Sequence, residues 1–335
     1  MTQPEYYDIT IIGGGPVGMF AATYARMRLA KTQIIESLDQ LGGQVATLFP
    51  AKKIYDIPGY PAITGEELIS NLKQQLETFA PDIFLGETVQ SFVKTSAGFK
   101  ITTSKRITYS KTIIIATGAG AFEPRKLTLE NATSFEGRNL HYFIKDPSIF
   151  QGQDIAIAGG GDSAIDWALE LVPSVRSLHL IHRRDKFRAL EANLEALKQT
   201  KTNFQTPYLI ADLSQVDNKL KIQLKSKTAP QKEIYVDHLL VNYGFTSDPK
   251  LINSWDLALH QREIQVNDQH ETSLAQVYAI GDIAYHPGKI NLIATGFGEA
   301  PSAVNNALLA IYPEKRQPAH STQLIKKFKA ESDKP

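Results

Sequence analysis

Short apolar runs alternate with helix-like stretches along this chain, and one order of strand, turn and helix occurs twice. Residues 7–12 are apolar and β-branched, as expected of a buried parallel strand, and residues 19–25 are helix-like. Residues 155–158 and 165–171 repeat this order. Glycine-rich turns at 13–18 and 159–164 join each strand to its helix. The pattern predicts two similar strand–turn–helix units.

Both turns have the glycine spacing of a dinucleotide-binding loop. The key positions are Gly13, Gly15 and Gly18 in the first glycine loop (residues 13–18), and Gly159, Gly161 and Ala164 in the second (residues 159–164). The first position permits a tight turn, the second lets a pyrophosphate approach the backbone, and the third lets helix pack on strand. Two ordinary glycine turns are the alternative. The repeated context favours two bound dinucleotides.

The residue that ends the second strand of each unit contacts the ribose in such folds. Glu36 follows Gly13 by 23 residues, and His182 follows Gly159 by the same number. A carboxylate accepts hydrogen bonds from ribose hydroxyls and repels a 2′-phosphate, so the first site suits FAD or NAD. After His182 come Arg183, Arg184 and Arg188, and guanidinium groups match phosphate. We expect NADPH at the second site; a solvated basic helix start is the alternative.

The remaining pattern places the second unit inside the first. A strand at 109–115 ends near Gly118, and a new pattern begins near Lys250, so we expect boundaries near residues 120 and 248. Between them, 191–199 is a predicted amphipathic helix, and 207–224 and 234–243 are predicted strands. Thr64 and Glu67 form a capping box before an apolar helix face, Leu68, Leu72, Leu76 and Phe79. The predicted fold is α/β, with two Rossmann-like three-layer domains, residues 121–247 being inserted into a discontinuous domain of 1–120 and 248–335.

Composition narrows the chemistry. The 335 residues carry a net charge of +1 and include no cysteine, which excludes disulfides, thiolate metal sites and a dithiol relay. The histidines lack metal-ligand spacing, so we expect no metal. Nothing in the sequence resembles a nucleic-acid surface, a basic leader or an 18-residue apolar span. We expect a cytoplasmic protein that binds neither nucleic acid nor membrane.

Later motifs point to a family. Residues 277–280 lead into Gly281-Asp282 and then into 291–300, which resembles the second flavin motif of two-dinucleotide flavoproteins. With Leu41-Gly42-Gly43-Gln44 and Ala116-Thr117-Gly118, nearly the whole chain resembles low-molecular-weight thioredoxin reductases. The Cys-x-x-Cys of that family is replaced by Tyr142, Phe143, Ile144 and Lys145. The closer resemblance is to the thioredoxin-reductase-like ferredoxin:NADP(H) reductases, which lack the redox cysteines and add a C-terminal tail.

That resemblance implies one FAD per subunit in the discontinuous domain, NADPH in the inserted domain, ferredoxin or flavodoxin as partner, and a homodimer. The implied FAD contacts, besides the first glycine loop, are Glu36, Gln44, Phe49, Val89, Phe122, Asp282, His320 and Thr322. Phe49 and His320 would cover the two ring faces, Thr322 would approach the ring, and Val89 would contact the adenine through its backbone. The reactive atom is flavin N5, so no side chain is expected as general acid or base. The alternatives are a core position for Phe49 and a disordered tail around His320.

The resemblance also implies movement, because NADPH cannot stack on a covered ring. We expect hinges near 118–122 and 244–248. Other functions stay open. Phe135, Gly137 and His141 partly match a Baeyer–Villiger monooxygenase fingerprint, which then fails at Lys145. Another NADPH-dependent flavin reductase, or a redox-responsive binding protein without turnover, is also compatible with the motifs. Lys326, Lys327 and Lys329 form a basic tail that is either solvated or steers an acidic partner.

Overall fold

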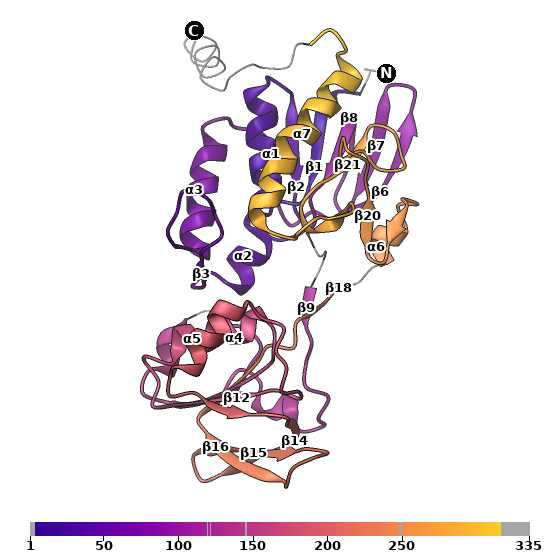
Figure 1. The fold of residues 1–335 in the computed structure, drawn as a ribbon. Coiled ribbons are helices and arrows are strands. Elements are labelled where there is room, and N and C mark those ends of the chain that lie inside the picture. The colour runs from indigo at the N-terminus through magenta and orange to yellow at the C-terminus, as the bar shows by residue number, and fades with distance from the viewer. Residues whose placement is uncertain (1–3, 119, 121, 145, 248–249, 316–335) are drawn as a thin grey trace. The chain divides into compact units, whose positions relative to one another are not determined.

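The computed structural model describes residues 4–118, 120, 122–144, 146–247 and 250–315, and the chain divides into two compact units (Figure 1). The outer unit comprises residues 1–121 and 248–335, and the inserted unit comprises residues 122–247. Each unit has its own sheet and its own core.

The sheet of the outer unit has a parallel centre. Its strands are β1 (Tyr6–Ile12), β2 (Thr32–Ile35), β5 (Asp82–Phe84), β6 (Val89–Thr95), β7 (Gly98–Thr103), β8 (Ile107–Ile115) and β21 (Val277–Ala279). The order is β5-β2-β1-β8-β7-β6, and β21 pairs in parallel with the second half of β8. The first half of β8 pairs antiparallel with β7. The carboxyl ends of β1, β2, β8 and β21 therefore lie at one edge, where the loops that follow them meet.

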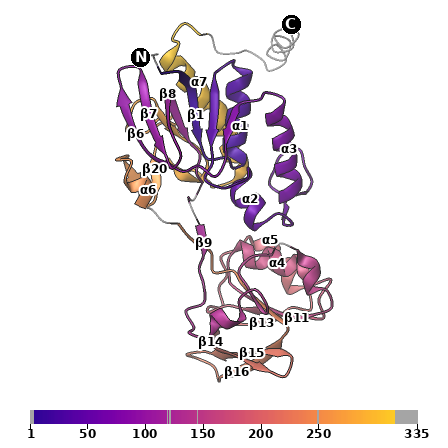
Figure 2. The ribbon, with the colours of Figure 1, turned by 180° about the vertical axis from the view of Figure 1, so that it is seen from behind.

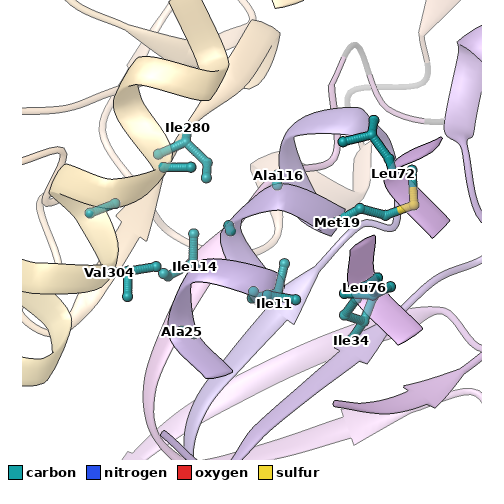
Figure 3. Packing of buried hydrophobic residues seen from close by; sticks show 14 of the residues in the cluster. Ile11, Met19, Ala25, Ile34, Leu72, Leu76, Ile114, Ala116, Ile280 and Val304 are labelled. Atoms are coloured by element: carbon teal, nitrogen blue, oxygen red, sulfur yellow. The ribbon is translucent and has the colours of Figure 1, made fainter. Parts of the chain in front are cut away.

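Helices α1 (Pro16–Met27), α3 (Gly65–Glu77) and α7 (Ile293–Ile311) pack on one face of this sheet (Figures 1 and 2). The period of two in the strands divides their side chains between the faces. Ile34 and Ile114 join the helix-side core, whereas Ile35 and Ile113 join the core on the other face. Figure 3 shows the helix-side core, in which Met19 lies with Ile34 and Ile114. Each such buried side chain contributes about 1.5–3 kcal/mol.

The helix predicted after Thr64 is confirmed with its cap. The Thr64 side chain accepts from the Glu67 amide, and the Glu67 carboxylate accepts from the Thr64 amide at 3.0 Å. Leu68, Leu72 and Leu76 are buried in the helix-side core. This capping box fixes the start of α3, whose apolar face packs beside α1.

The inserted unit has a fully parallel sheet in the order β10-β17-β11-β12-β13. Its strands are β10 (Leu140–His141), β11 (Asp154–Ala158), β12 (Ser177–Ile181), β13 (Asn203–Gln205) and β17 (His238–Val241). Helices α4 (Asp162–Leu171) and α5 (Glu191–Lys198) lie on one side. An antiparallel sheet of β14 (Leu209–Val216), β15 (Lys219–Lys225) and β16 (Lys232–Val236) lies on the other (Figure 2). The unit is therefore a three-layer sandwich.

The strands predicted at 207–224 and 234–243 are confirmed, with one refinement: β14 and β15 form a hairpin, whereas β16 and β17 belong to different sheets. The helix predicted at 191–199 is α5. Strands β9 (Phe122–Pro124) and β18 (Phe245–Ser247) pair antiparallel where the chain enters and leaves the inserted unit. The smaller elements are α2 (Gly43–Leu48), β3 (Lys53–Ile54), β4 (Ile63–Thr64), α6 (Lys250–Asn253), β19 (Leu259–His260), β20 (Glu263–Gln265), β22 (Ala284–Tyr285), η1 (Ala132–Phe135), η2 (Pro147–Phe150) and η3 (Gly281–Ile283).

Among the described residues, no helix combines the length and the apolar character that a membrane crossing requires.

Candidate dinucleotide sites

The first glycine loop connects β1 to α1, and its three glycines meet different surroundings. Gly13 has a φ of 110°, and a Cβ atom there would lie 2.5 Å from the carbonyl oxygen of Ala116. A Cβ on Gly18 would lie 2.0 Å from the carbonyl oxygen of Gly13. A Cβ on Gly15 would meet nothing within 4 Å. Gly13 and Gly18 are therefore required by packing, whereas Gly15 borders open space.

Open space beside Gly15 lies at the amino terminus of a helix. Gly15 is the N-cap of α1 with extended backbone, and Pro16 occupies the first helical position. Helix N-termini carry about half a positive charge and point N–H groups outward, which suits a phosphate. Nearby, the buried hydroxyl of Thr117 has no hydrogen-bond partner in the described part of the chain. These features fit the pyrophosphate of a dinucleotide.

Glu36 stands where β2 ends and is tied to the first glycine loop. Its Oε2 accepts a hydrogen bond from the Gly14 amide at 2.5 Å, and its Oε1 accepts from the Leu38 amide at 2.9 Å. The residue is only 6% exposed. The backbone amides fix this carboxylate at the edge of the loop, so it can accept from a ribose hydroxyl of a nucleotide bound there and disfavours a 2′-phosphate.

The second glycine loop, between β11 and α4, reproduces this geometry. A Cβ on Gly159 would lie 2.5 Å from the carbonyl oxygen of Asn242, just as a Cβ on Gly13 would lie 2.5 Å from that of Ala116. The same Cβ would lie 2.8 Å from that of Ala164, and a Cβ on Gly161 would meet nothing within 4 Å. Gly161 is the N-cap of α4, again with extended backbone. Two separate sheets therefore present the same glycine turn at the amino terminus of a helix.

Backbone hydrogen bonds match as well. The Gly13 amide donates to the carbonyl of Ile35 at 2.9 Å, and the Gly159 amide donates to that of Ile181 at 3.0 Å. The carbonyl of Gly14 accepts a hydrogen bond from the Gly42 amide, and the carbonyl of Gly160 accepts one from the Arg188 amide. Each glycine loop is thus held to the end of the second strand of its own unit.

His182 occupies the position equivalent to Glu36. A Cβ on Gly160 would lie 2.3 Å from its ring, so the imidazole covers the second glycine loop. Burial lowers the pKa of His182, and the guanidinium groups of Arg183, Arg184 and Arg188 lower it further. The ring is thereby favoured in its neutral form beside three cations.

The three arginines are exposed, and they lie on a loop. Residues 183–186 form bends, and the next helix starts only at Glu191, so the interpretation of this basic run as a helix start is wrong. The backbone hydrogen bond from Arg188 to Gly160, 2.7 Å long, folds the loop back over the second glycine loop. The guanidinium groups thus lie on the segment that follows His182 and borders the second glycine loop.

The second flavin motif lies at the edge where β21 ends. Gly281 and Asp282 form η3, directly after the strand, and α7 begins eleven residues later, at Ile293. Solvent reaches the Asp282 side chain, yet desolvation by the surrounding protein raises the pKa of its carboxyl. A Cβ on Gly296, in the first turn of α7, would lie 2.4 Å from Val17 of the first glycine loop. The motif therefore abuts the first glycine loop, within one unit.

The other residues implied by the resemblance are only partly brought to this edge. Gln44, on α2, is adjacent to Gly118, and Phe49 ends α2 half-buried rather than in the core. Val89, at the start of β6, is 2% exposed, so its side chain is closed to a ligand. Phe122 begins β9. His320 and Thr322 lie outside the described residues.

Sequence reasoning missed Lys289 and Glu299. Both side chains are buried and both bind the backbone of Gly281. Glu299 belongs to the motif at 293–300 that carried the resemblance, but the sequence alone assigned no role to this residue. No pattern connected Lys289 to it. Among the described residues, no group of three or more His, Cys, Asp or Glu is arranged to hold a metal ion.

Comparison with known proteins agrees with this geometry. The family model of pyridine nucleotide-disulphide oxidoreductases matches residues 7–307. The chain is 55% identical to the ferredoxin–NADP reductase of Ligilactobacillus salivarius, over 98% of each chain. It is 50% identical to ferredoxin–NADP reductase 2 of Bacillus subtilis, over 96% of this chain and 98% of that one.

Among solved structures, the chain is similar to thioredoxin reductase from Lactococcus lactis, with 29% identity and a TM-score of 0.79 over 92% of this chain and 99% of that one. Thioredoxin reductase from T. acidophilum gives the same TM-score at 24% identity, over 92% of this chain and 98% of that one, which is a likeness of fold. The predicted fold class, two Rossmann-like domains, is confirmed by these neighbours.

Proposed function

The chain belongs to the pyridine nucleotide-disulphide oxidoreductase family, and on that premise we propose that it is a ferredoxin–NADP reductase that moves electrons between NADPH and ferredoxin with FAD as its cofactor. The observation that carries this proposal is the 55% identity, over 98% of the chain, to a relative of that name. The absence of cysteine supports it, since neither a disulfide nor a dithiol relay can form.

FAD belongs to the outer unit in this proposal. Gly13, Gly15 and Gly18 provide the turn on which the pyrophosphate rests, and Glu36 accepts from the adenosine ribose. Asp282, beside the first glycine loop, serves the ribityl and phosphate portion. When bound, FAD converts between the two-electron chemistry of nicotinamide and the one-electron chemistry of ferredoxin. The protein supplies binding, orientation and exclusion of water, so no side chain is assigned as general acid or base.

The isoalloxazine ring would be covered by Phe49 on one face and by His320 on the other, with Thr322 near the ring. Gln44, Phe122 and the backbone of Val89 complete the proposed FAD contacts. Phe49 is compatible with this role, because it is half-buried at the end of α2. The hinges expected near 118–122 and 244–248 stay a prediction, and residues 119, 121 and 248 of these ranges lie outside the described part of the chain.

NADPH belongs to the inserted unit. Gly159, Gly161 and Ala164 form its pyrophosphate turn, and neutral His182 lies beside the ribose. Arg183, Arg184 and Arg188 would bind the 2′-phosphate, since guanidinium groups pair with phosphate oxygens in a planar, two-point geometry. The contrast between Glu36 and His182 at equivalent positions supports one cofactor without a 2′-phosphate and one with it.

Ferredoxin is the proposed partner. Flavodoxin as an alternative partner, a homodimer, and a cytoplasmic location stay predictions. Steering of an acidic partner by Lys326, Lys327 and Lys329 is also a prediction and concerns residues outside the described part of the chain.

The test is to purify the protein, record its flavin spectrum, and measure cytochrome c reduction with NADPH or NADH, with and without ferredoxin. We expect bound FAD, a preference for NADPH, and reduction that depends on ferredoxin. A preparation that neither contains nor takes up FAD would refute the proposal. Stoichiometric oxygenation of a ketone would favour the monooxygenase alternative, and no turnover with any acceptor would favour the binding protein.

A further inference from the structure

A buried ion pair holds the residue that immediately precedes Asp282. Lys289, in the loop before α7, and Glu299, two turns into α7, approach within 2.9 Å between Nζ and Oε1. Their side chains are 4% and 5% exposed. Neither residue belongs to the glycine loops or to the loop that carries Arg183, Arg184 and Arg188.

The pair holds both polar backbone groups of one residue. The Gly281 amide donates to Glu299 Oε2 at 2.7 Å, and Lys289 Nζ donates to the Gly281 carbonyl at 2.6 Å. Gly281 has a φ of 69° and immediately precedes Asp282. The direction in which the chain leaves β21 toward Asp282 is therefore fixed by hydrogen bonds to two side chains.

The same pair ties the turn to α7. Glu299 extends from the helix to Gly281, and Gly281 and Gly296 both pack against Val17 of the first glycine loop, where a Cβ would lie 3.5 Å and 2.4 Å from its side chain. The start of α7, the Asp282 turn and the first glycine loop are thus one packed assembly.

Stability alone does not account for charges at this place. Desolvation of two buried ions costs several kcal/mol, and an apolar pair of similar volume is often as stable or more so. Removal of one partner, in contrast, leaves an uncompensated charge. Both members also act on Asp282: Lys289 lowers the pKa of its carboxyl and Glu299 raises it. Two histidines are nearby, His286 with Nε2 3.6 Å from Glu299 Oε1, and His270 with its ring 6.2 Å from that of His286.

We propose that Lys289 and Glu299 are positioning residues for the flavin: together they orient Asp282 and the start of α7, and their mutual neutralisation sets the charge that the flavin meets there. This inference rests on the proposed function, because it requires FAD beside Asp282. It assigns an electrostatic role in tuning the cofactor to two buried residues.

The experiment compares Lys289→Met, Glu299→Gln, the double variant and Lys289→Arg with the wild type. The flavin reduction potential is measured at pH 8 by equilibration with a reference dye, and the FAD dissociation constant is measured by flavin fluorescence on apoprotein. Lys289→Met leaves a negative charge and should lower the potential, because it opposes added electrons. Glu299→Gln leaves a positive charge and should raise it. The double variant should fall between them, and Lys289→Arg should stay near the wild type.

Both single variants should also weaken FAD binding by about tenfold, since each leaves a buried polar group unpaired. Opposite shifts of potential separate this role from a merely structural one, which would move both variants in the same direction. Shifts of the same sign, or none in Glu299→Gln, overturn the inference. Should Lys289→Met fail to fold, Glu299→Gln and Lys289→Arg still decide it, since only the former should shift the potential.

The matched control is Lys198→Met, which breaks the exposed pair with Glu195, 2.7 Å long, in the inserted unit. It should change neither the potential nor FAD affinity. Thermal unfolding of each apoprotein separates folding defects from cofactor effects. A wild-type protein that takes up no FAD would refute the proposed function, whereas a FAD-binding wild type with unshifted variants would refute only the role of the pair.

Discussion

Gly161→Ala isolates the ligand-facing position of the second glycine loop. The backbone at Gly161 is extended, with φ −104° and ψ −179°, so an alanine adopts it without strain. A Cβ there meets no atom of the protein within 4 Å. The added methyl group can therefore disturb only what approaches the loop from outside.

The magnitudes follow from that geometry. Replacing glycine by a compatible alanine gains about 0.4–1 kcal/mol from the unfolded state, and alanine is a poorer N-cap by a similar amount, so the free energy of unfolding should change by less than about 0.5 kcal/mol. A pyrophosphate held off the amides loses hydrogen bonds to a charged group worth about 1.5–3 kcal/mol each. The loss of one such bond weakens NADP⁺ binding by roughly 10- to 150-fold.

Calorimetric titration with NADP⁺ and thermal unfolding together test this. Gly15→Ala is the reciprocal control: its site is equally open, so it should weaken FAD retention and leave NADP⁺ affinity unchanged. Gly18→Ala is the packing control. Its Cβ would lie 2.0 Å from the Gly13 carbonyl oxygen, so it should destabilise the outer unit by about 1–3 kcal/mol or more.

Unchanged NADP⁺ affinity in a normally folded Gly161→Ala protein would refute the assignment of the second glycine loop as a pyrophosphate site. A large loss of stability would refute the geometric argument itself, because it would mean that Gly161 is required by packing.

Three other predictions concern single features. Replacing Arg183 and Arg184 by alanine should raise KM for NADPH by about tenfold or more and leave KM for NADH nearly unchanged. Steady-state kinetics with both cofactors measure this, and an equal rise in both KM values would contradict it. Glu36→Ala removes the acceptor that ends β2 and should weaken FAD binding by about tenfold, measured by fluorescence on apoprotein, with normal affinity counting against the ribose assignment. Burial and neighbouring His238 lower the pKa of His141 from 6.5 to about 4. Below pH 6.5 the unfolded chain binds a proton that the folded chain does not, so the free energy of unfolding should fall as the pH decreases from 6.5 toward 4. His141→Gln should reduce this loss in thermal unfolding scans, and a pH profile identical to that of the wild type would contradict the prediction.

Local patterns in the sequence predicted what short-range physics encodes. The capping box at Thr64 and Glu67 was correct because both bonds join residues three apart. The two strand–turn–helix units were correct because glycine, β-branched and helix-forming residues act within one short segment. The common 23-residue spacing to Glu36 and His182 was informative because in a βαβ unit the length of one helix fixes which residue ends the next strand. The absence of cysteine excluded disulfide and dithiol chemistry.

Tertiary structure decided the features that depend on distant partners. A basic run with helical spacing is a loop, because Arg188 hydrogen-bonds to Gly160, far upstream. The contacts of Lys289 and Glu299 with Gly281 depend on the packing of α7 against the end of β21, because Gly281 and Glu299 are 18 positions apart. A charged residue looks solvated in a sequence, and only packing shows that its charge is buried and paired. The chain alone therefore determined two dinucleotide folds and a redox chemistry without sulfur, whereas the side chains that hold the Asp282 turn were decided by the three-dimensional meeting of a loop and a helix.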